Sequence, residues 1–302
     1  MPTLPINCFR PVSQLLFYLL IKPLSYLPLR ALYLLSDGLY GLLYHVIGYR
    51  KAVVRSNLAG AFPQRSEAER RKIERAFYRH LCDLMVEAIR LFSISERDIL
   101  RRCHIRNPEL LTPYAAQGRS VIVAAAHYNN WELNGAASDR QISHQAVGAY
   151  TAIKDPFFSR VLTDSRSRFG LRMVPVREIQ AFFAQPGQPP FAMLFAGDQS
   201  PRKPERAYWT TFLGRDTGVM WGTERYAKQY NLPVFYGRMI KVRRGCYEAE
   251  FELITDTPRA TAEGEITEAH TRLLEADIRQ APQFWLWSHK RWKHKKPETR
   301  QV

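Results

Sequence analysis

An α/β fold with a mixed, mostly parallel central sheet flanked by helices is the architecture that the sequence predicts. From residue 108 onward, short apolar runs alternate with helical patterns, as in "SVIVAAA" followed by "NWELNGAAS". Such alternation is typical of parallel strands joined by crossover helices. Two longer runs, "LPVFYGRMIKV" and "CYEAEFELI", flank Arg244 and Gly245 and predict a hairpin that gives the sheet an antiparallel edge.

The other elements of this region follow in order along the chain. Pro156 suits the first turn of a helix and Gly170 suits its end, which predicts a helix between them. Further strands are predicted for "AVGAYTAI", "LRMVPV" and "PPFAMLFAGDQ", and further helices for "REIQAFFAQ" and "GTERYAKQYN". In such sheets ligands gather at the carboxyl ends of strands, where His127 and Asp198 both fall. No P-loop and no dinucleotide glycine fingerprint is present, so we expect no nucleotide cofactor.

Three regions are predicted along the chain. Residues 1–50 form a membrane-associated helical segment, residues 51–106 a helical region, and residues 107–302 the α/β core, with 51–302 expected to form one compact unit. Within the helical region, Ser66 and Glu69 have the spacing of a capping box. An apolar residue then recurs every three or four positions, which predicts a long amphipathic helix: Ile73, Phe77, Leu81, Leu84, Ala88 and Phe92.

The N-terminal segment has the composition of a membrane-facing helix. Residues 12–49 are rich in leucine and tyrosine and contain one acidic residue, Asp37. Tyrosine suits the interface between lipid and water, because its ring is apolar and its hydroxyl is polar. Pro23 and Pro28 divide the segment into short pieces. The sequence therefore predicts an interfacial helical hairpin or one marginal span, and the alternative is a set of buried helices in a soluble core.

Charge is the most informative feature of the composition. The 302 residues include 44 Lys and Arg against 28 Asp and Glu, a formal net charge of +16. This excess attracts polyanions, which could be an anionic membrane, a phosphorylated substrate or nucleic acid. The four cysteines are scattered and form no CxxC pair, so we expect neither a zinc site nor a disulfide framework. The histidines are equally scattered, and no metal site is predicted.

The candidate chemistry lies in "AAAHYNNWELNG", where His127 follows an apolar strand and Glu132 comes five residues later. A histidine can take a proton from a hydroxyl when a carboxylate holds its other ring nitrogen. The same pattern also fits an ordinary turn from a strand to a helix. No serine occupies a nucleophile elbow and no Cys/His pair is evident. If the reaction is acyl transfer, direct attack by the acceptor hydroxyl is thus simpler than a covalent intermediate.

Five blocks in the right order give this motif a context: "RSNLAGAFP", "HYNNWE", "LFAGDQSPRK", "WTTFLGRDTGVMWGTERYAKQYNLPVFYGR" and "QFWLWSHKRWK". They resemble the glycerolipid acyltransferase superfamily with its H-x4-D/E motif. More specifically, they resemble the bacterial lipid A biosynthesis late acyltransferases of the lauroyl/myristoyl type. The resemblance covers residues 10–295, and "DQSPR" and "WLWSHKRWK" look most like the Bacteroidetes branch.

This resemblance implies a glycerol-3-phosphate acyltransferase-like fold and an enzyme at the cytoplasmic face of the inner membrane, single-pass or monotopic. An acyl group would pass from acyl carrier protein, or from acyl-CoA, to a hydroxyl of a phosphorylated lipid A precursor, without a cofactor or a metal. His127 would be the general base and Glu132 its partner. The resemblance places Asp198 and Gln199 on the acceptor or oxyanion side. The other candidates for substrate contact are Asn130, Lys154, Arg166, Arg168, Arg202 and Lys203.

Two departures from the family pattern and two alternatives accompany this assignment. Ser200-Pro201-Arg202 stands where many relatives have a Tyr-Gly-Arg type sequence, and the N-terminal prolines weaken the expected span. One alternative is acylation of another lyso-lipid, a lysophospholipid or an aminolipid. The other is a non-catalytic basic protein that binds membranes or nucleic acid, which the tail "WLWSHKRWKHKKPETR" suggests. No known nucleic-acid-binding module emerges, so nucleic acid is not an expected partner.

Overall fold

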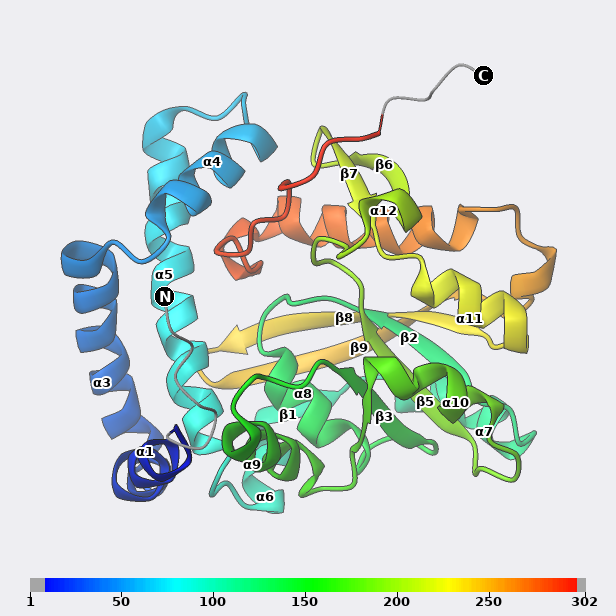
Figure 1. Ribbon diagram of the computed structural model, residues 1–302, viewed down its shortest axis with the longest axis horizontal. Coiled ribbons are helices and arrows are strands. Elements are labelled where there is room, and N and C mark those ends of the chain that lie inside the picture. The colour runs from blue at the N-terminus through cyan, green and yellow to red at the C-terminus, as the bar shows by residue number, and fades with distance from the viewer. Residues whose placement is uncertain (1–8, 298–302) are drawn as a thin grey trace.

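A seven-stranded mixed sheet forms the centre of the computed structural model, which describes residues 9–297 (Figure 1). The strand order is β1-β9-β8-β2-β5-β3-β4, and every neighbouring pair is parallel except β8 and β9. The predicted mixed, mostly parallel sheet is therefore confirmed. One short strand, β1, pairs with β9 at the edge of the sheet and was not predicted. The strands are β1 Cys103–Ile105, β2 Val121–Ala125, β3 Gln145–Tyr150, β4 Arg172–Pro175, β5 Phe191–Ala196, β8 Val234–Arg243 and β9 Cys246–Thr255.

Helices cover both faces of this sheet, which explains the continuous apolar run of β2. Ile122 packs into an apolar cluster with residues of α10 and α11, whereas its neighbour Val123 packs into a separate cluster with Leu111 and Phe235. A strand that is buried on both faces needs apolar side chains at successive positions rather than at alternate ones. In Figure 1, α11 and α12 lie on one side of the sheet, and α8 and α9 lie on the other. The helices between residue 96 and residue 280 are α6 Glu96–Arg102, α7 Thr112–Ala116, α8 Trp131–Ser138, α9 Pro156–Ser167, α10 Ile179–Ala184, α11 Gly222–Tyr230 and α12 Glu265–Gln280.

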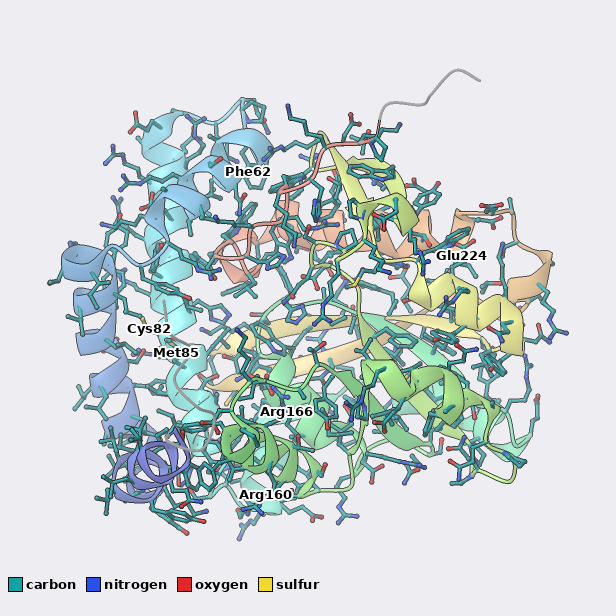
Figure 2. The ribbon with its side chains drawn as sticks, in the orientation of Figure 1. Phe62, Cys82, Met85, Arg160, Arg166 and Glu224 are labelled. Carbon is teal, nitrogen blue, oxygen red and sulfur yellow. The ribbon has the colours of Figure 1, made fainter. Side chains whose placement is uncertain are left out.

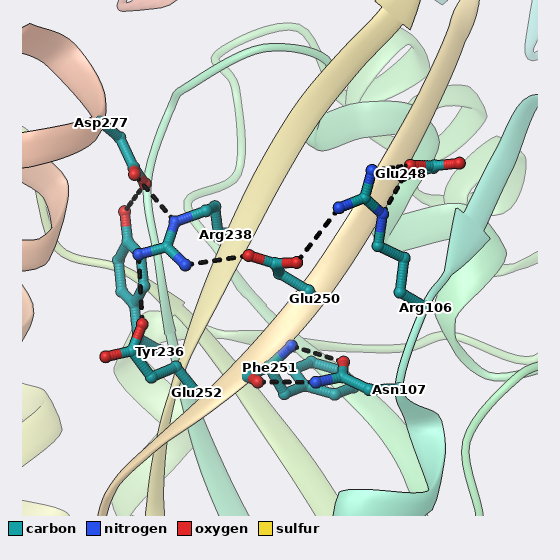
Figure 3. Close-up of polar contacts among 9 residues, drawn as sticks. All are labelled: Arg106, Asn107, Tyr236, Arg238, Glu248, Glu250, Phe251, Glu252 and Asp277. Carbon is teal, nitrogen blue, oxygen red and sulfur yellow. Dashed lines mark hydrogen bonds and ion pairs between the residues drawn. The ribbon is translucent and has the colours of Figure 1, made fainter. Parts of the chain in front are cut away.

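A second sheet, the two-stranded hairpin of β6 (Tyr208–Phe212) and β7 (Arg215–Val219), was not predicted. By contrast, the long hairpin of β8 and β9 forms where the sequence predicts it. Figure 3 shows how ion pairs tie that hairpin to the rest of the fold: Arg238 contacts Asp277 of α12 at 2.8 Å and Glu250 of β9 at 2.9 Å. These contacts fix α12 against the strands that lead to the site.

The helical region that follows the N-terminal segment begins with α4 (Lys51–Ala61) and α5 (Glu67–Arg90). The capping box predicted for α5 is present, with Ser66 and Glu69 bonded to one another's backbone amides. Ile73, Phe77 and Leu81 of the predicted apolar stripe are buried, whereas its later members are only partly buried and Phe92 lies beyond the end of the helix. Three acidic side chains of α5, Glu74, Asp83 and Glu87, are buried as well, and the sequence pattern gives no sign of this.

The N-terminal segment forms two helical pieces that meet near Pro28, and in Figure 1 α1 is seen end-on whereas α3 runs along α5, so the pieces do not lie side by side as a hairpin would. The first comprises α1 (Phe9–Leu16), η2 (Phe17–Ile21) and α2 (Lys22–Ser25), and the second comprises α3 (Leu29–Tyr40) and η3 (Gly41–Ile47). Within the described part of the chain, we find no helix both long and apolar enough to cross a bilayer.

The second piece buries a mixed inner face, with Leu32 and Ser36 both buried, and exposes apolar residues on its outer side. Ser36 is 1% exposed and donates to Asp83 at 2.8 Å, and the hydroxyl of Tyr33 donates to Glu87 at 2.8 Å. On the outer side, Leu34 is 74% exposed and Val46 is 77% exposed. Such exposed leucine and valine side chains are unusual for a water-exposed helix of a globular protein, whose apolar face is buried.

Candidate active site

His127 and Asp198 meet because the strands that carry them are neighbours. Ala125 of β2 pairs with Ala196 of β5 in a parallel register, and each strand ends two residues before the functional side chain. The carboxyl ends of neighbouring parallel strands lie at the same edge of the sheet, which is where ligands bind in folds of this type. The structure therefore brings together two residues that are 71 positions apart.

Asp198 is the carboxylate that holds the histidine ring. Its Oδ1 lies 2.7 Å from Nδ1 of His127 and also accepts the backbone amide of His127 at 3.0 Å. Its Oδ2 accepts the indole N–H of Trp285 at 2.9 Å. With Nδ1 donating to this buried carboxylate, the Nε2 atom of the neutral ring carries the lone pair.

The basic nitrogen of His127 is within reach of a substrate. The side chain of His127 is 22% exposed, whereas that of Asp198 is 3% exposed. The amide nitrogen of Gln199 lies 3.2 Å from Nε2, at the position that an acceptor hydroxyl must approach. Gln199 is thus next to the ring nitrogen that Asp198 does not hold, and its predicted place on the acceptor or oxyanion side stays a prediction.

The surroundings of His127 raise its pKa. Burial of the ring lowers the pKa, but the charge and hydrogen bond of Asp198, together with the charge of Glu132, outweigh that effect. The same contacts lower the pKa of Asp198 to about 2, against the opposing effect of burial. The aspartate is therefore ionised at every physiological pH, and the histidine gains basicity from it.

Glu132 does not hold the ring of His127, which corrects the predicted base–partner contact. It forms a bidentate pair with Arg166 of α9, with N···O distances of 2.6 and 2.5 Å. Figure 2 shows Arg166 on the side of α9 toward the middle of the molecule, while Arg160 lies at the periphery. Glu132 is still near enough to raise the pKa of His127, but the charge of Arg166 lowers it.

The loop that carries His127 is shaped by the two asparagines of the motif. Asn129 adopts a left-handed backbone with φ of 54°, a conformation that asparagine tolerates better than most residues. Asn130 caps α8, because its Oδ1 accepts the amide of Leu133 at 2.9 Å. Asn130 is 4% exposed and its Nδ2 donates to Glu87, so it acts as a helix cap and not as the predicted substrate contact.

The C-terminal aromatic block holds the same loop from the other side. The backbone N–H of Asn129 donates to the backbone carbonyl of Phe284 at 2.9 Å, and Tyr128 forms a β-bridge with Trp285. The block is anchored in turn by Asn57 of the "RSNLAGAFP" motif, whose Nδ2 donates to the carbonyls of Trp287 and His289, each at 2.9 Å. Sequence reasoning recognised both motifs but did not find these roles. Trp285 and Trp287 are 3% and 0% exposed, so they are not available as stacking platforms for bases.

The remaining predicted contact residues differ in their surroundings. Arg168 donates to the backbone carbonyl of Leu91 at 2.9 Å, which anchors the end of α9 to the segment after α5. Lys154, Arg202 and Lys203 are exposed, and they form no ion pair with any other described residue. Over residues 9–297, no group of three histidine, cysteine or acidic side chains is arranged to hold a metal ion.

An α/β sheet that presents a carboxylate-held histidine at its strand ends is suited to general-base catalysis of group transfer. No serine or cysteine of the described chain hydrogen-bonds to that histidine as a nucleophile would. The family described as bacterial lipid A biosynthesis acyltransferase matches residues 10–294. The match covers nearly the whole sequence, and the chain belongs to this family.

Individual relatives agree with this assignment. A lipid A biosynthesis palmitoleoyltransferase of Escherichia coli (strain K12) is 23% identical over 248 residues, which are 81% of this chain and 79% of the relative. A lipid A biosynthesis lauroyltransferase of the same organism is 24% identical over 277 residues, 88% of this chain and 87% of the relative. The predicted family is therefore confirmed, and the Bacteroidetes branch stays a prediction.

Proposed function

We propose that this enzyme transfers a fatty acyl chain from a thioester donor to a hydroxyl of a phosphorylated lipid A precursor, with His127 as general base. The observation that carries the proposal is the contact between His127 Nδ1 and Asp198 Oδ1 at 2.7 Å, which leaves Nε2 as the basic nitrogen. The donor is acyl carrier protein or acyl-CoA, as the family resemblance implies. The reaction needs no cofactor, because proton transfer and charge stabilisation suffice for acyl transfer from a thioester.

The proposed reaction proceeds in two steps without a covalent enzyme intermediate. Nε2 of His127 takes the proton of the acceptor hydroxyl while its oxygen attacks the thioester carbon, which produces a tetrahedral oxyanion. Collapse of this intermediate breaks the C–S bond, and the departing thiolate takes the proton back from Nε2. Asp198 stabilises the imidazolium that exists between the two steps.

The two carboxylates near His127 have separate roles in this scheme. Arg166 neutralises most of the charge of Glu132, whereas Asp198 forms no ion pair with any arginine or lysine of the described chain. Asp198 therefore orients the ring, and Glu132 holds Arg166 toward the site, where its guanidinium is suited to an oxyanion or a phosphate. The exposed cations Lys154, Arg202 and Lys203 would contribute to binding of the phosphorylated headgroup.

The identity of the acceptor is tested by mass spectrometry of lipid A from cells with and without the gene. We expect the deletion strain to lack one acyl chain, and the wild-type gene to restore it while a His127→Ala gene does not. Purified enzyme, assayed with acyl carrier protein or CoA thioesters of the same chain, identifies the donor. An unchanged lipid A acyl count together with an altered lysophospholipid or aminolipid pool would favour the alternative acceptor.

The N-terminal helices are the proposed membrane contact, on the cytoplasmic face of the inner membrane and without a span. The outer residues of both pieces are apolar and exposed, with Leu19 at 70%, Leu34 at 74% and Val46 at 77%. The guanidinium of Arg79 lies 5.1 Å from the ring centre of Tyr40, so a cation borders this apolar band. Apolar side chains flanked by cations are the features that bind an anionic bilayer surface.

We expect the double substitution Leu34→Asp and Val46→Asp to weaken binding to vesicles that contain anionic lipid by at least about tenfold. Burial of each such side chain contributes roughly 1.5–3 kcal/mol, which the substitution removes. Vesicle flotation measures the effect. The matched control is Leu253→Asp, at an apolar residue of β9 that is 46% exposed outside the N-terminal helices. Equal loss of binding in the control, or no loss in the double variant, would contradict this assignment.

A further inference from the structure

Glu87 is a buried carboxylate at the point where three parts of the fold meet. It is 4% exposed, and three side chains donate hydrogen bonds to it. Tyr33 of α3 donates to Oε1 at 2.8 Å, while Tyr247 of β9 and Asn130 donate to Oε2 at 2.8 and 2.6 Å. All three donors are neutral side chains, and the nearby charge of Lys241 also favours the ionised carboxylate.

One end of this cluster is the start of α8, which follows the loop that carries His127. Asn130 has both ends of its amide engaged, since Nδ2 donates to Glu87 and Oδ1 accepts from the amide of Leu133 at the start of α8. His127 lies three residues before Asn130, and Glu132 lies two residues after it. Movement of the Glu87 carboxylate would therefore shift the cap of α8 and the position of both functional side chains.

The other end is the N-terminal helix with the exposed apolar face. Tyr33 directly precedes Leu34, which is 74% exposed, so adjacent sides of α3 contact Glu87 and solvent. The hydroxyl of Tyr33 also lies against Gly245 in the β8–β9 turn, where φ is +74° and a Cβ atom would collide with that hydroxyl. The position of the Tyr33 hydroxyl is therefore fixed by Glu87 on one side and by Gly245 on the other.

We propose that Glu87 is a positioning residue, through which the seating of α3 on a membrane sets the orientation of α8 and of the His127 loop that precedes it. The inference rests on the proposed membrane contact of the N-terminal helices. Tyr33 and Asn130 both donate to the carboxylate of Glu87. A shift of α3 that moves Tyr33 would therefore move this carboxylate, and with it the side chain of Asn130 that caps α8. A buried acceptor group cannot exchange a lost donor for water without penalty, so the two contacts hold or fail together.

The test compares Tyr33→Phe with Tyr247→Phe in the full-length enzyme. Each change removes one hydroxyl donor from the same carboxylate, but only Tyr33 lies on the N-terminal helix. The readout is the ratio of kcat with substrate presented in anionic vesicles to kcat with the same substrate dispersed in detergent. We expect the wild-type ratio of the two kcat values to exceed one. Tyr33→Phe should lower this ratio to about one. Tyr247→Phe should lower both kcat values in parallel and leave the ratio unchanged.

Two measurements separate this inference from the proposals on which it rests. Flotation shows whether Tyr33→Phe still binds vesicles, which we expect because its outer apolar face is unchanged. A Glu87→Gln variant should lower kcat by roughly tenfold with little change in KM, because it weakens a hydrogen-bonded cluster without touching substrate. A wild-type ratio of one, or the same ratio in both tyrosine variants, would overturn the inference. Absence of acyl transfer by the wild-type enzyme would instead overturn the proposed function.

Discussion

Replacement of His127 by alanine should lower kcat by roughly 10²–10⁴-fold, which is the usual contribution of a positioned general base. The acceptor hydroxyl would have to lose its proton to water, and the leaving thiolate would have no nearby acid. KM should change little, because Nε2 binds the hydroxyl through one hydrogen bond among many substrate contacts. Initial rates with an acyl thioester and a lipid A precursor, measured by mass spectrometry of the product, give both constants.

His127→Gln is the matched control for this experiment. A glutamine amide can donate to Asp198 as Nδ1 does, but it has no basic nitrogen, so the free energy of unfolding should stay near that of the wild type while activity is lost. Alanine leaves the buried Asp198 with the backbone amide of residue 127 and the indole of Trp285 as donors. Both variants should still float with vesicles. Activity within tenfold of the wild type in either variant would remove His127 from the base role.

The local sequence was sufficient to find the histidine but not its partner. An apolar strand followed by His127 predicts a polar group at a strand end, and the structure confirms that placement. The partner could not be chosen in the same way, because the pairing of β2 with β5 is a property of the whole sheet. Glu132 was favoured by proximity in sequence, yet α8 begins between it and His127 and directs it toward Arg166. Proximity in space follows from strand order, which no local pattern contains.

Long-range polar contacts account for most of what else the sequence could not reveal. Asn57 and Trp285 lie in motifs that are recognisable from sequence, but their contacts cross the molecule to His289 and Asp198. The burial of the acidic side chains of α5 could not be predicted from the sequence, because helical periodicity records apolar positions only. Glu87 is buried there because hydroxyl and amide donors from distant elements replace its water shell.

The pH dependence of the rate should report which carboxylate controls His127. Only the neutral imidazole can act as base, so kcat/KM should rise with pH as His127 loses its proton. Burial lowers the pKa of His127, but the charge and hydrogen bond of Asp198 raise it above its ordinary value, so the midpoint of this rise should lie at higher pH than for an ordinary histidine. Below that midpoint the enzyme should lose about tenfold in rate for each further pH unit.

Asp198→Asn should reduce the plateau rate by roughly 10²–10⁴-fold and move this midpoint to lower pH. Without the aspartate charge, burial becomes the dominant influence on the ring and favours its neutral form, so the pKa of His127 falls. The base is then neutral over a wider pH range but weaker, its tautomer is no longer fixed, and the imidazolium of the intermediate has lost its stabilising charge. A lower midpoint combined with a slower plateau distinguishes this change from simple misfolding, which lowers the rate at every pH.

Glu132→Gln is the comparison that decides between the two carboxylates. It removes a charge that Arg166 already neutralises and leaves the bond between His127 and Asp198 in place. The plateau rate should therefore fall less than in Asp198→Asn, and KM should rise because Arg166 loses the partner that holds it toward the site. If Glu132→Gln instead gave the larger loss of kcat and the larger shift of the midpoint, Glu132 would be the orienting group. The observed contact of Asp198 would then belong to a state in which the site is not engaged with substrate.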